Sequence, residues 1–251
     1  MLHWLYPRIC AVCGEPAGRG LSLCEACRRR IPRLRKPICL HCGTPLSRGP
    51  ALPGACDVCR GFSGEFDFAR SALRDSPEAH RLAVDLKYHR ALHLADTLAG
   101  FLNELWEESP RLRAFPDWHL VPVPMTFARL HRRGYNQSEE LARALGRLRG
   151  LRTIRLLVHD KKDALSQTFL DAPARARHAF QVYKASPAAA SGRRTPPPRL
   201  LLIDDVWTTG ATIRACARSL KRLPGVQTVG ALTVLRVEKS SRAGEPFPPP
   251  P

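Results

Sequence analysis

Residues 200–212, LLLIDDVWTTGAT, carry an apolar run, two adjacent carboxylates and a turn rich in hydroxyl groups. The four apolar residues predict a buried strand of the kind found in parallel sheets. The residues that follow, IRACARSLKR, predict a helix, so the carboxylates and hydroxyls fall between a strand and a helix. Neighbouring carboxylates at a strand end repel each other and are costly when partly buried, so they require a hydroxyl, a metal or a cation as partner.

The turn after the carboxylates has the features of a phosphate site. In an open α/β sheet, ligands bind at the carboxyl ends of strands, where a helix N-terminus offers N–H groups and the positive end of its dipole. Threonine hydroxyls add donors here, and Gly210 lets the backbone approach a phosphate closely. Asp204 and Asp205 can accept hydrogen bonds from vicinal sugar hydroxyls. The stretch therefore predicts a sugar 5-phosphate site; the alternative is an Asp pair that caps the helix, with the threonines as ordinary turn residues.

Strands and helices alternate along the rest of the chain. The sequence predicts helices at 76–110, 136–150 and 211–225, and strands at 118–124 and 226–237. The first helix contains a candidate break at 88–92, and Asn136, followed by Glu139, is the expected cap of the second. The alternation predicts an α/β sheet. Residues 184–199 and 239–251, rich in Pro, Ser and Ala or in Pro alone, predict a mobile loop and a disordered tail.

Eight of the nine cysteines form four C-x-x-C pairs near the N-terminus. The pairs are Cys10/Cys13, Cys24/Cys27, Cys39/Cys42 and Cys56/Cys59. A tetrahedral Zn²⁺ takes four thiolates, and a two-residue gap lets both sulfurs of a pair face one ion. ICAVCG resembles ICLHCG, and this repeat favours two sequential sites, with the interleaved pairing as the alternative. We expect two structural zinc ions, with Cys216 free; a thioredoxin-type redox pair fits four regular pairs less well.

The chain is strongly basic, with 40 Lys+Arg against 22 Asp+Glu and a formal net charge of +18. Eight thiolates and two Zn²⁺ ions would lower that charge to +14. Such an excess indicates polyanionic partners, or else a solvated basic surface. The N-terminus lacks the apolar core of a signal peptide, and no run reaches the roughly 18 apolar residues of a membrane span. We therefore predict a cytoplasmic protein with reduced thiols and no membrane insertion.

Several stretches together resemble a known family. LLIDDVWTTGAT resembles the phosphoribosyl-pyrophosphate (PRPP) motif of type I phosphoribosyltransferases. VPVP, RRGYNQSEELA, LKY at 86–88 and the cysteine pairs resemble the ComF (competence protein F) family, and the resemblance covers nearly all of residues 4–237. It implies a type I phosphoribosyltransferase fold, a mainly parallel sheet flanked by helices, preceded by a small double zinc ribbon. The implied domains are 1–61, the zinc ribbon, and 62–238, the phosphoribosyltransferase-like domain.

The resemblance also implies roles for individual residues. Asp204 and Asp205 would hold the ribose hydroxyls and are the catalytic candidates. The implied PRPP-binding residues are Asp204, Asp205, Val206, Thr208, Thr209, Gly210, Ala211 and Thr212. Those on the pyrophosphate side are Pro124, Met125, Thr126, Arg132, Arg133 and Lys87. Mg²⁺ would arrive with the pyrophosphate rather than through a dedicated protein cage. For Lys87, a solvated helix lysine is the alternative.

The chain departs from the family pattern in two places. The basic stretch between Gln167 and Phe180 is short, and His178 stands where an asparagine is expected. The glycine that usually follows LKY is absent, and His89 and Arg90 stand there instead.

Two functions of different classes fit these features. In the first, an enzyme binds PRPP, or another ribose 5-phosphate ligand, and passes the phosphoribosyl group to an unknown acceptor. In the second, the same scaffold handles single-stranded DNA without catalysis. The resemblance implies a link to natural competence and to DNA-uptake proteins under either function. Aromatic residues make up only 7% of the chain and few lie beside basic clusters to stack bases, which favours the enzyme.

Overall fold

The computed structural model describes residues 9–18, 22–47, 56–61, 64–160, 182–192 and 195–237. Its centre is a four-stranded sheet in the order β1-β6-β5-β2, with every neighbouring pair parallel. The strands are β1 (Phe68–Arg74), β2 (His119–Pro122), β5 (Arg199–Trp207) and β6 (Thr228–Arg236). The predicted α/β fold with a mainly parallel sheet is confirmed, and it is consistent with the type I phosphoribosyltransferase fold.

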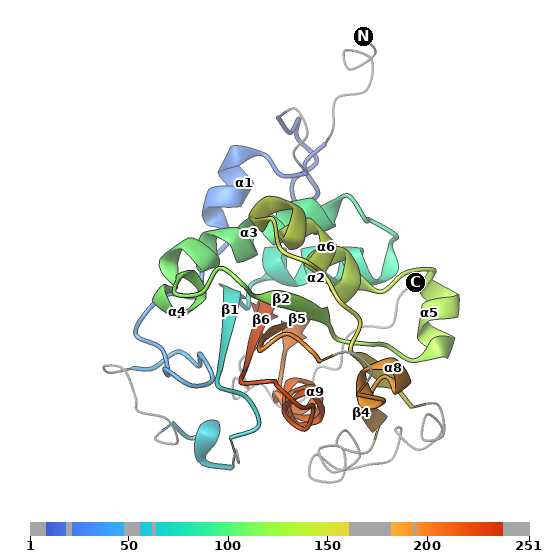
Figure 1. The fold of residues 1–251 in the computed structure, drawn as a ribbon. Coiled ribbons are helices and arrows are strands. Elements are labelled where there is room, and N and C mark those ends of the chain that lie inside the picture. Colours follow the sequence, from blue (N-terminus) through green and yellow to red (C-terminus); the bar gives the residue numbers. More distant parts are fainter. Residues whose placement is uncertain are drawn as a thin grey trace.

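Helices cover both faces of the sheet. On one side lie α2 (Pro77–Tyr88), α3 (Leu94–Glu108) and α6 (Gln137–Arg149), and on the other lies α9 (Ala211–Lys221) (Figure 1). The Ser76 side chain accepts a hydrogen bond from the N–H of Ala79 and caps α2. The predicted break at 88–92 is confirmed, because α2 ends at Tyr88 and α3 begins at Leu94.

The turn between α2 and α3 contains Arg90 in the left-handed region, with φ of 53°. A glycine adopts this conformation without the steric cost that a Cβ adds. The structure thus gives a reason for the glycine of the family pattern that this chain replaces.

The short elements lie around this core. They are α1 (Glu25–Arg30), η1 (Cys59–Gly61), α4 (Pro110–Arg113), α5 (Phe127–Arg133), β3 (Leu157–His159), β4 (Tyr183–Ala185) and α8 (Pro187–Ala190). β3 and β4 pair antiparallel as a separate two-stranded sheet. The prediction of a loop without secondary structure at 184–199 is wrong for its first part, which holds the end of β4 and all of α8. Ser186 caps that helix and Pro187 occupies its first turn, a strong local start signal.

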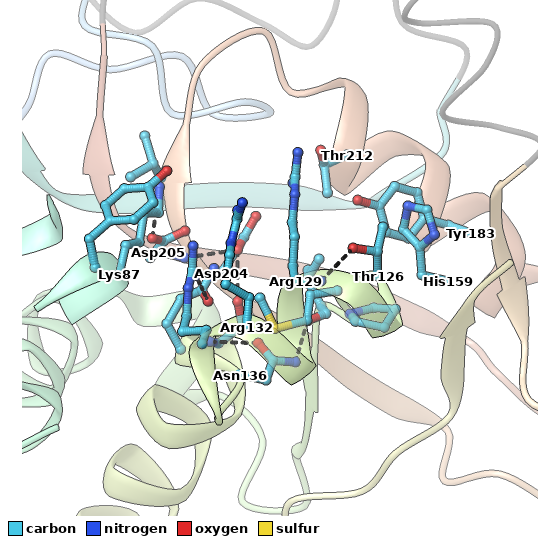
Figure 2. Close-up of a pocket in the computed structure, with 18 of the residues that line it drawn as sticks. Lys87, Thr126, Arg129, Arg132, Asn136, His159, Tyr183, Asp204, Asp205 and Thr212 are labelled. Atoms are coloured by element: carbon cyan, nitrogen blue, oxygen red, sulfur yellow. Dashed lines mark hydrogen bonds and ion pairs between the residues drawn. The ribbon is translucent and has the colours of Figure 1, made fainter. Parts of the chain in front are cut away.

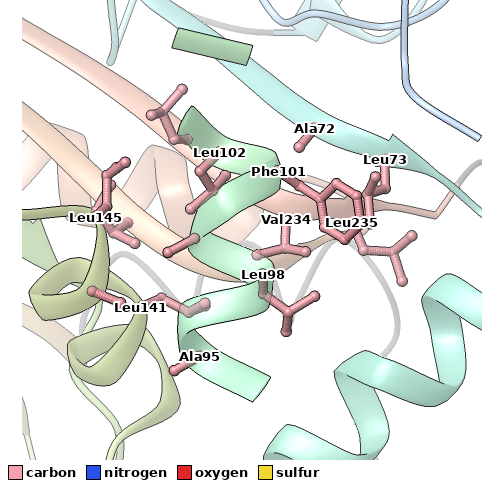
Figure 3. Packing of buried hydrophobic residues seen from close by; sticks show 14 of the residues in the cluster. Ala72, Leu73, Ala95, Leu98, Phe101, Leu102, Leu141, Leu145, Val234 and Leu235 are labelled. Carbon is pink, nitrogen blue, oxygen red and sulfur yellow. The ribbon is translucent and has the colours of Figure 1, made fainter. Parts of the chain in front are cut away.

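Two hydrophobic clusters occupy the two faces of the sheet. On one face, α3 packs Leu98, Phe101 and Leu102 against β1 and β6, beside Leu141 and Leu145 of α6 (Figure 3). On the other face, α9 packs against the sheet. Alternate residues of the LLLI run in β5 enter the two clusters, so the strand is buried on both sides as its continuous apolar run predicts. Each such buried leucine contributes about 1.5–3 kcal/mol by removal from water.

The cysteine-rich segment covers the exposed edge of β1. The N–H of Leu34 donates to the carbonyl of Ala72 at 2.8 Å, and the N–H of Ala69 donates to the carbonyl of His41 at 2.7 Å. An uncovered edge strand presents unpaired backbone groups, so this contact both satisfies and protects the sheet. The segment also shares the two hydrophobic clusters with the sheet. The boundary predicted between residues 61 and 62 stays a prediction.

Some expectations fall outside the described residues. These are the tail at 239–251 and the residues of the shortened basic stretch, Gln167 to Phe180. Within the described part of the chain, no helix combines the length and apolar character that crossing a membrane requires.

Candidate functional site

A pocket of about 340 Å³ lies near the carboxyl ends of β2 and β5. It is lined by Lys87, Tyr88, Val123, Pro124, Met125, Thr126, Arg129, Arg132, Arg133, Asn136, Gln137, Ser138, His159, Tyr183, Asp204, Asp205, Val206, Thr208 and Thr212. The residues predicted for PRPP and pyrophosphate binding all line it except Thr209, Gly210 and Ala211, which lie at the start of α9. The parallel sheet brings these separate stretches together, because the carboxyl ends of its strands meet at one edge.

The two carboxylates lie within β5 and not after it. The strand runs on to Trp207, so its predicted end at the Asp pair is wrong. Hydrogen bonding to β6 continues through this region, where Asp204 pairs with Thr233. As a result both carboxylates are buried, with exposed fractions of 8% for Asp204 and 4% for Asp205.

Each buried carboxylate has its own partner from another element. The Nζ of Lys87 lies 2.9 Å from Oδ2 of Asp205 (Figure 2). The hydroxyl of Ser138 donates to Oδ1 of Asp204 at 2.9 Å, and the N–H of Asp205 donates to the same oxygen at 3.0 Å. The partners are thus a cation from α2 and a hydroxyl from α6. The reading of Lys87 as a solvated helix lysine is wrong.

The pKa values of this group follow from burial and mutual charge. Burial, and next the charge of Asp205, raise the pKa of Asp204 to about 7. Burial lowers the pKa of Lys87, but attraction to Asp205 outweighs it and the net pKa lies above the ordinary value. At neutral pH Lys87 is therefore positively charged. Asp204 passes from the neutral acid to the carboxylate as the pH rises through about 7.

The raised pKa predicts how Asp204→Asn changes stability with pH. A carboxyl that holds its proton more tightly when folded stabilises the fold fully below its unfolded pKa of about 4, and that contribution is lost as pH rises through 7. The amide cannot ionise and can still accept from Ser138, so the variant should escape this loss. We expect the free energy of unfolding of the variant, relative to that of wild type, to be higher at pH 8 than at pH 5 by more than about 1 kcal/mol. Denaturant unfolding of both proteins at the two pH values measures this difference. Equal differences at the two pH values would contradict the raised pKa.

The turn at 208–212 is shaped by Gly210. Its φ is 77°, and a Cβ there would lie 2.4 Å from the ring of Trp207. Gly210 is also the N-cap of α9 and gives it no side-chain hydrogen bond, whereas Thr209 accepts one from the N–H of Ala211 at 3.4 Å. The alternative of an Asp pair that caps this helix is therefore wrong.

A cationic rim faces the carboxylates. Pro124, Met125 and Thr126 follow β2, and Thr126 caps α5 by accepting from the N–H of Arg129. This short helix directs Arg129, Arg132 and Arg133 to the pocket, as Figure 2 shows for the first two. Arg133 lies over the ring of Tyr88, 5.1 Å from its centroid. Among the described residues, no carboxylate forms an ion pair with Arg129 or Arg132, so these two cations can face an anionic ligand.

The sequence did not predict several pocket residues. Arg129 could have been found, since it lies one helical turn before the predicted Arg132 and Arg133. The side chain of Asn136 caps α6 as predicted, but its Nδ2 also donates to the carbonyl of Val123 at 3.0 Å and holds the 123–126 loop. Ser138 has only an ordinary first-turn position in the sequence.

The β3–β4 pair supplies two further pocket residues. The rings of His159 and Tyr183 meet edge to face, with centroids 5.0 Å apart. Burial raises the pKa of Tyr183, although a hydrogen bond with Thr212 acts in the other direction. Two short strands distant from the motif carry no local signal of such a role.

The eight paired cysteines form two groups. The first cysteine cluster is Cys10, Cys13, Cys24 and Cys27, and the second cysteine cluster is Cys39, Cys42, Cys56 and Cys59. Their sulfurs approach to 3.7 Å between Cys13 and Cys24 and to 3.6 Å between Cys42 and Cys56. Four sulfurs about 2.3 Å from one zinc are separated by roughly 3.8 Å at the edges of a tetrahedron. The clusters therefore fit structural zinc, and the sequential pairing is confirmed over the interleaved one.

Comparison with known proteins agrees with these features. Residues 1–60 match the family model of a double zinc ribbon domain. The chain is 32% identical to competence protein F of Haemophilus influenzae over 110 residues, which are 44% of this chain and 46% of that protein. It is 28% identical to the DNA utilization protein YhgH of Escherichia coli O6:H1 over 222 residues, 88% of this chain and 86% of that protein. The resemblance to the ComF family is confirmed. Competence protein ComFC of Bacillus subtilis is a further ComF relative, 30% identical over 49% of this chain and 48% of its own length.

Proposed function

We propose that this ComF-like chain binds PRPP with Mg²⁺ in the pocket and transfers its phosphoribosyl group to an acceptor. The observation that carries the proposal is the arrangement of charge. Two carboxylates lie in the pocket lining, Arg129 and Arg132 face them without a carboxylate partner among the described residues, and a threonine-rich turn precedes a helix N-terminus. A ligand with vicinal hydroxyls and two separate phosphate groups matches these three features, whereas a simple phosphate uses only one of them.

The ribose is proposed to lie over Asp204 and Asp205. A charged carboxylate that accepts from a sugar hydroxyl makes a hydrogen bond worth about 1.5–3 kcal/mol. Asp205 lies beside the cation of Lys87, and Asp204 gains a negative charge as the pH passes 7. The 5-phosphate is proposed to bind at Thr208 and Thr212, next to the N-terminus of α9.

The pyrophosphate is proposed to face Arg129 and Arg132. When it leaves C1, the bond between C1 and its bridging oxygen breaks and the electron pair stays on the pyrophosphate. The two arginines offset the charge that grows there, and the carboxylates offset the positive charge of the ribose ring. Mg²⁺ bound to pyrophosphate would add Lewis-acid neutralisation. It needs few protein ligands, since it keeps waters and binds through substrate phosphates.

The names of the relatives support a role for this chain in competence or DNA utilization. They include a competence protein and a DNA utilization protein. We propose that this chain acts in the cytoplasm in the same context, with zinc-ribbon and basic surfaces available to nucleic acid.

Release of pyrophosphate tests the transfer. We expect the protein to release pyrophosphate from PRPP and Mg²⁺ faster in the presence of a suitable acceptor, and nucleobases and single-stranded DNA are the first to try. Arg132→Met should slow release, while Arg147→Met, a change to an arginine paired with Asp96 and absent from the pocket lining, should not. Release at the uncatalysed rate with every acceptor would contradict the enzymatic proposal.

A second candidate is single-stranded DNA handling without catalysis. It is favoured by the net charge of +18 and by the name of the YhgH relative. It predicts weak binding without sequence preference that falls steeply as salt rises, because phosphate contacts release counterions. Such binding together with no pyrophosphate release would favour this candidate over the enzyme.

A further inference from the structure

The two cysteine clusters differ in their surroundings. Cys39, Cys42, Cys56 and Cys59 of the second cluster are all buried, with exposed fractions of 5% or less. They pack in the same hydrophobic cluster as Trp207 and the core-facing side of α9. In the first cluster, Cys13 is exposed. The second cluster therefore lies inside the core that supports the 208–212 turn.

Arg236 connects the second cluster to the sheet. This residue of β6 is 3% exposed, and its guanidinium donates to the carbonyl of Cys42 at 2.8 Å and to the hydroxyl oxygen of Thr44 at 2.5 Å. One guanidinium nitrogen lies 3.9 Å from the Cys42 sulfur. The Thr44 hydroxyl is itself 3.0 Å from that sulfur. The position of Cys42 is thus fixed to the last residue of β6.

The same guanidinium continues to the phosphate turn through Trp207. It lies over the indole ring, 4.7 Å from the centroid. The same ring packs against Gly210, where even a methyl group would lie 2.4 Å from it. Arg236, Trp207 and Gly210 therefore form a continuous packed series from the second cluster to the turn.

A second set of contacts, between aromatic rings, also leads from the second cluster to Trp207. His41, between Cys39 and Cys42 in sequence, meets the ring of Phe66 at 4.5 Å. Phe66 in turn meets Trp207 at 5.9 Å, edge to face. Both series end on the same indole ring, so a displacement of the second cluster would reach the turn through Trp207.

We infer that Arg236 and Trp207 are positioning residues through which zinc at the second cluster fixes the shape of the 208–212 turn. Among the described residues, the first cluster has no comparable link to the turn, since its arginine contact, Arg30 to the sulfur of Cys27, comes from an exposed side chain of its own segment. The importance of the turn for ligand binding rests on the proposed function. The inference that the second cluster fixes the turn does not depend on the proposed function.

Two pairs of variants test the inference. The Nε1 of Trp207 is buried and has no acceptor among the described residues, so Trp207→Phe removes volume under Gly210 without breaking a hydrogen bond. Its control is Trp118→Phe, which is also fully buried but in the other hydrophobic cluster, and which loses one hydrogen bond, from Nε1 to the carbonyl of Leu112. Arg236→Met breaks the link at the second cluster, and Arg30→Met makes the equivalent change at the first. Arg236→Lys serves if the methionine variant does not fold.

Hydrogen exchange of the amides at 208–214 is measured together with zinc content and with the affinity for ribose 5-phosphate. We expect exchange to rise about tenfold or more in Trp207→Phe and Arg236→Met, with two zinc ions retained, and to stay at the wild-type rate in both controls. Affinity for ribose 5-phosphate should fall in the same two variants. Wild-type exchange in both Trp207→Phe and the Arg236 variant would overturn the inference. If exchange rises as expected but wild type does not bind ribose 5-phosphate, the inference stands and the proposed function fails.

Discussion

Cys42→Ser is expected to prevent the chain from folding, whereas Cys13→Ser should leave a folded α/β domain with one zinc. Structural zinc contributes about 10–16 kcal/mol to the folding of small zinc domains, comparable to the whole net stability of a typical protein. Cys42 is fully buried in the hydrophobic cluster that the cysteine-rich segment shares with the sheet, while Cys13 lies at the surface. The same loss of a ligand should therefore have very different consequences at the two clusters.

Metal analysis and circular dichroism check this expectation. Wild type should contain two zinc ions per chain. Cys216→Ser is the matched control, because Cys216 is equally buried but belongs to neither cluster. It should keep both zinc ions and a cooperative unfolding transition. A Cys42→Ser protein that unfolds at the wild-type midpoint would contradict the structural role of the second cluster.

The second large effect is expected at the phosphate turn. Gly210→Ala should destabilise the protein by roughly 2–5 kcal/mol and abolish binding of a phosphate ligand. One part of this cost is the left-handed φ of 77°, which an alanine adopts at about 1–2 kcal/mol. The larger part is steric, since the new methyl would lie 2.4 Å from the rigid ring of Trp207.

Gly150→Ala separates these two contributions. Gly150 has a φ of 67° at the end of α6, but nothing lies within 4 Å of a Cβ built there. It should lose only the backbone part, about 1–2 kcal/mol. Denaturant unfolding of both variants gives the comparison. If Gly210→Ala costs no more than Gly150→Ala, Trp207 does not support the turn as described.

The fold could be predicted largely because its signals are local. The LLLI run of β5, the cap at Asn136 and the break after Tyr88 are all patterns of neighbouring residues. β1 was missed because FARSALR is interrupted by arginine and serine. Those residues are buried because they contact residues distant in the sequence. The Ser71 hydroxyl lies 2.7 Å from that of Thr233 on the neighbouring strand, and Arg70 donates to carbonyls of the cysteine-rich segment.

The candidate site, too, could be predicted only where its residues are neighbours in the sequence. The PRPP-like motif is contiguous, so its residues could be named from the sequence. The partners of its carboxylates could not be assigned, because Ser138 lies 66 residues from Asp204 and Lys87 comes from another helix. The pairing of the cysteines could be predicted from their repeat, because each half of the repeat contains the four cysteines of one site.

Isothermal titration of PRPP with Mg²⁺ at pH 8 tests the sugar-phosphate pocket most directly. At this pH Asp204 is largely ionised in wild type, and Asp204→Asn keeps its shape and its bond from Ser138. We predict that wild type binds PRPP and that Asp204→Asn binds it roughly ten- to a hundredfold more weakly, through loss of a charge-assisted hydrogen bond to the ribose. No binding by folded wild type at millimolar PRPP, or equal affinities of the two proteins, would contradict the assignment of this pocket to a ribose phosphate.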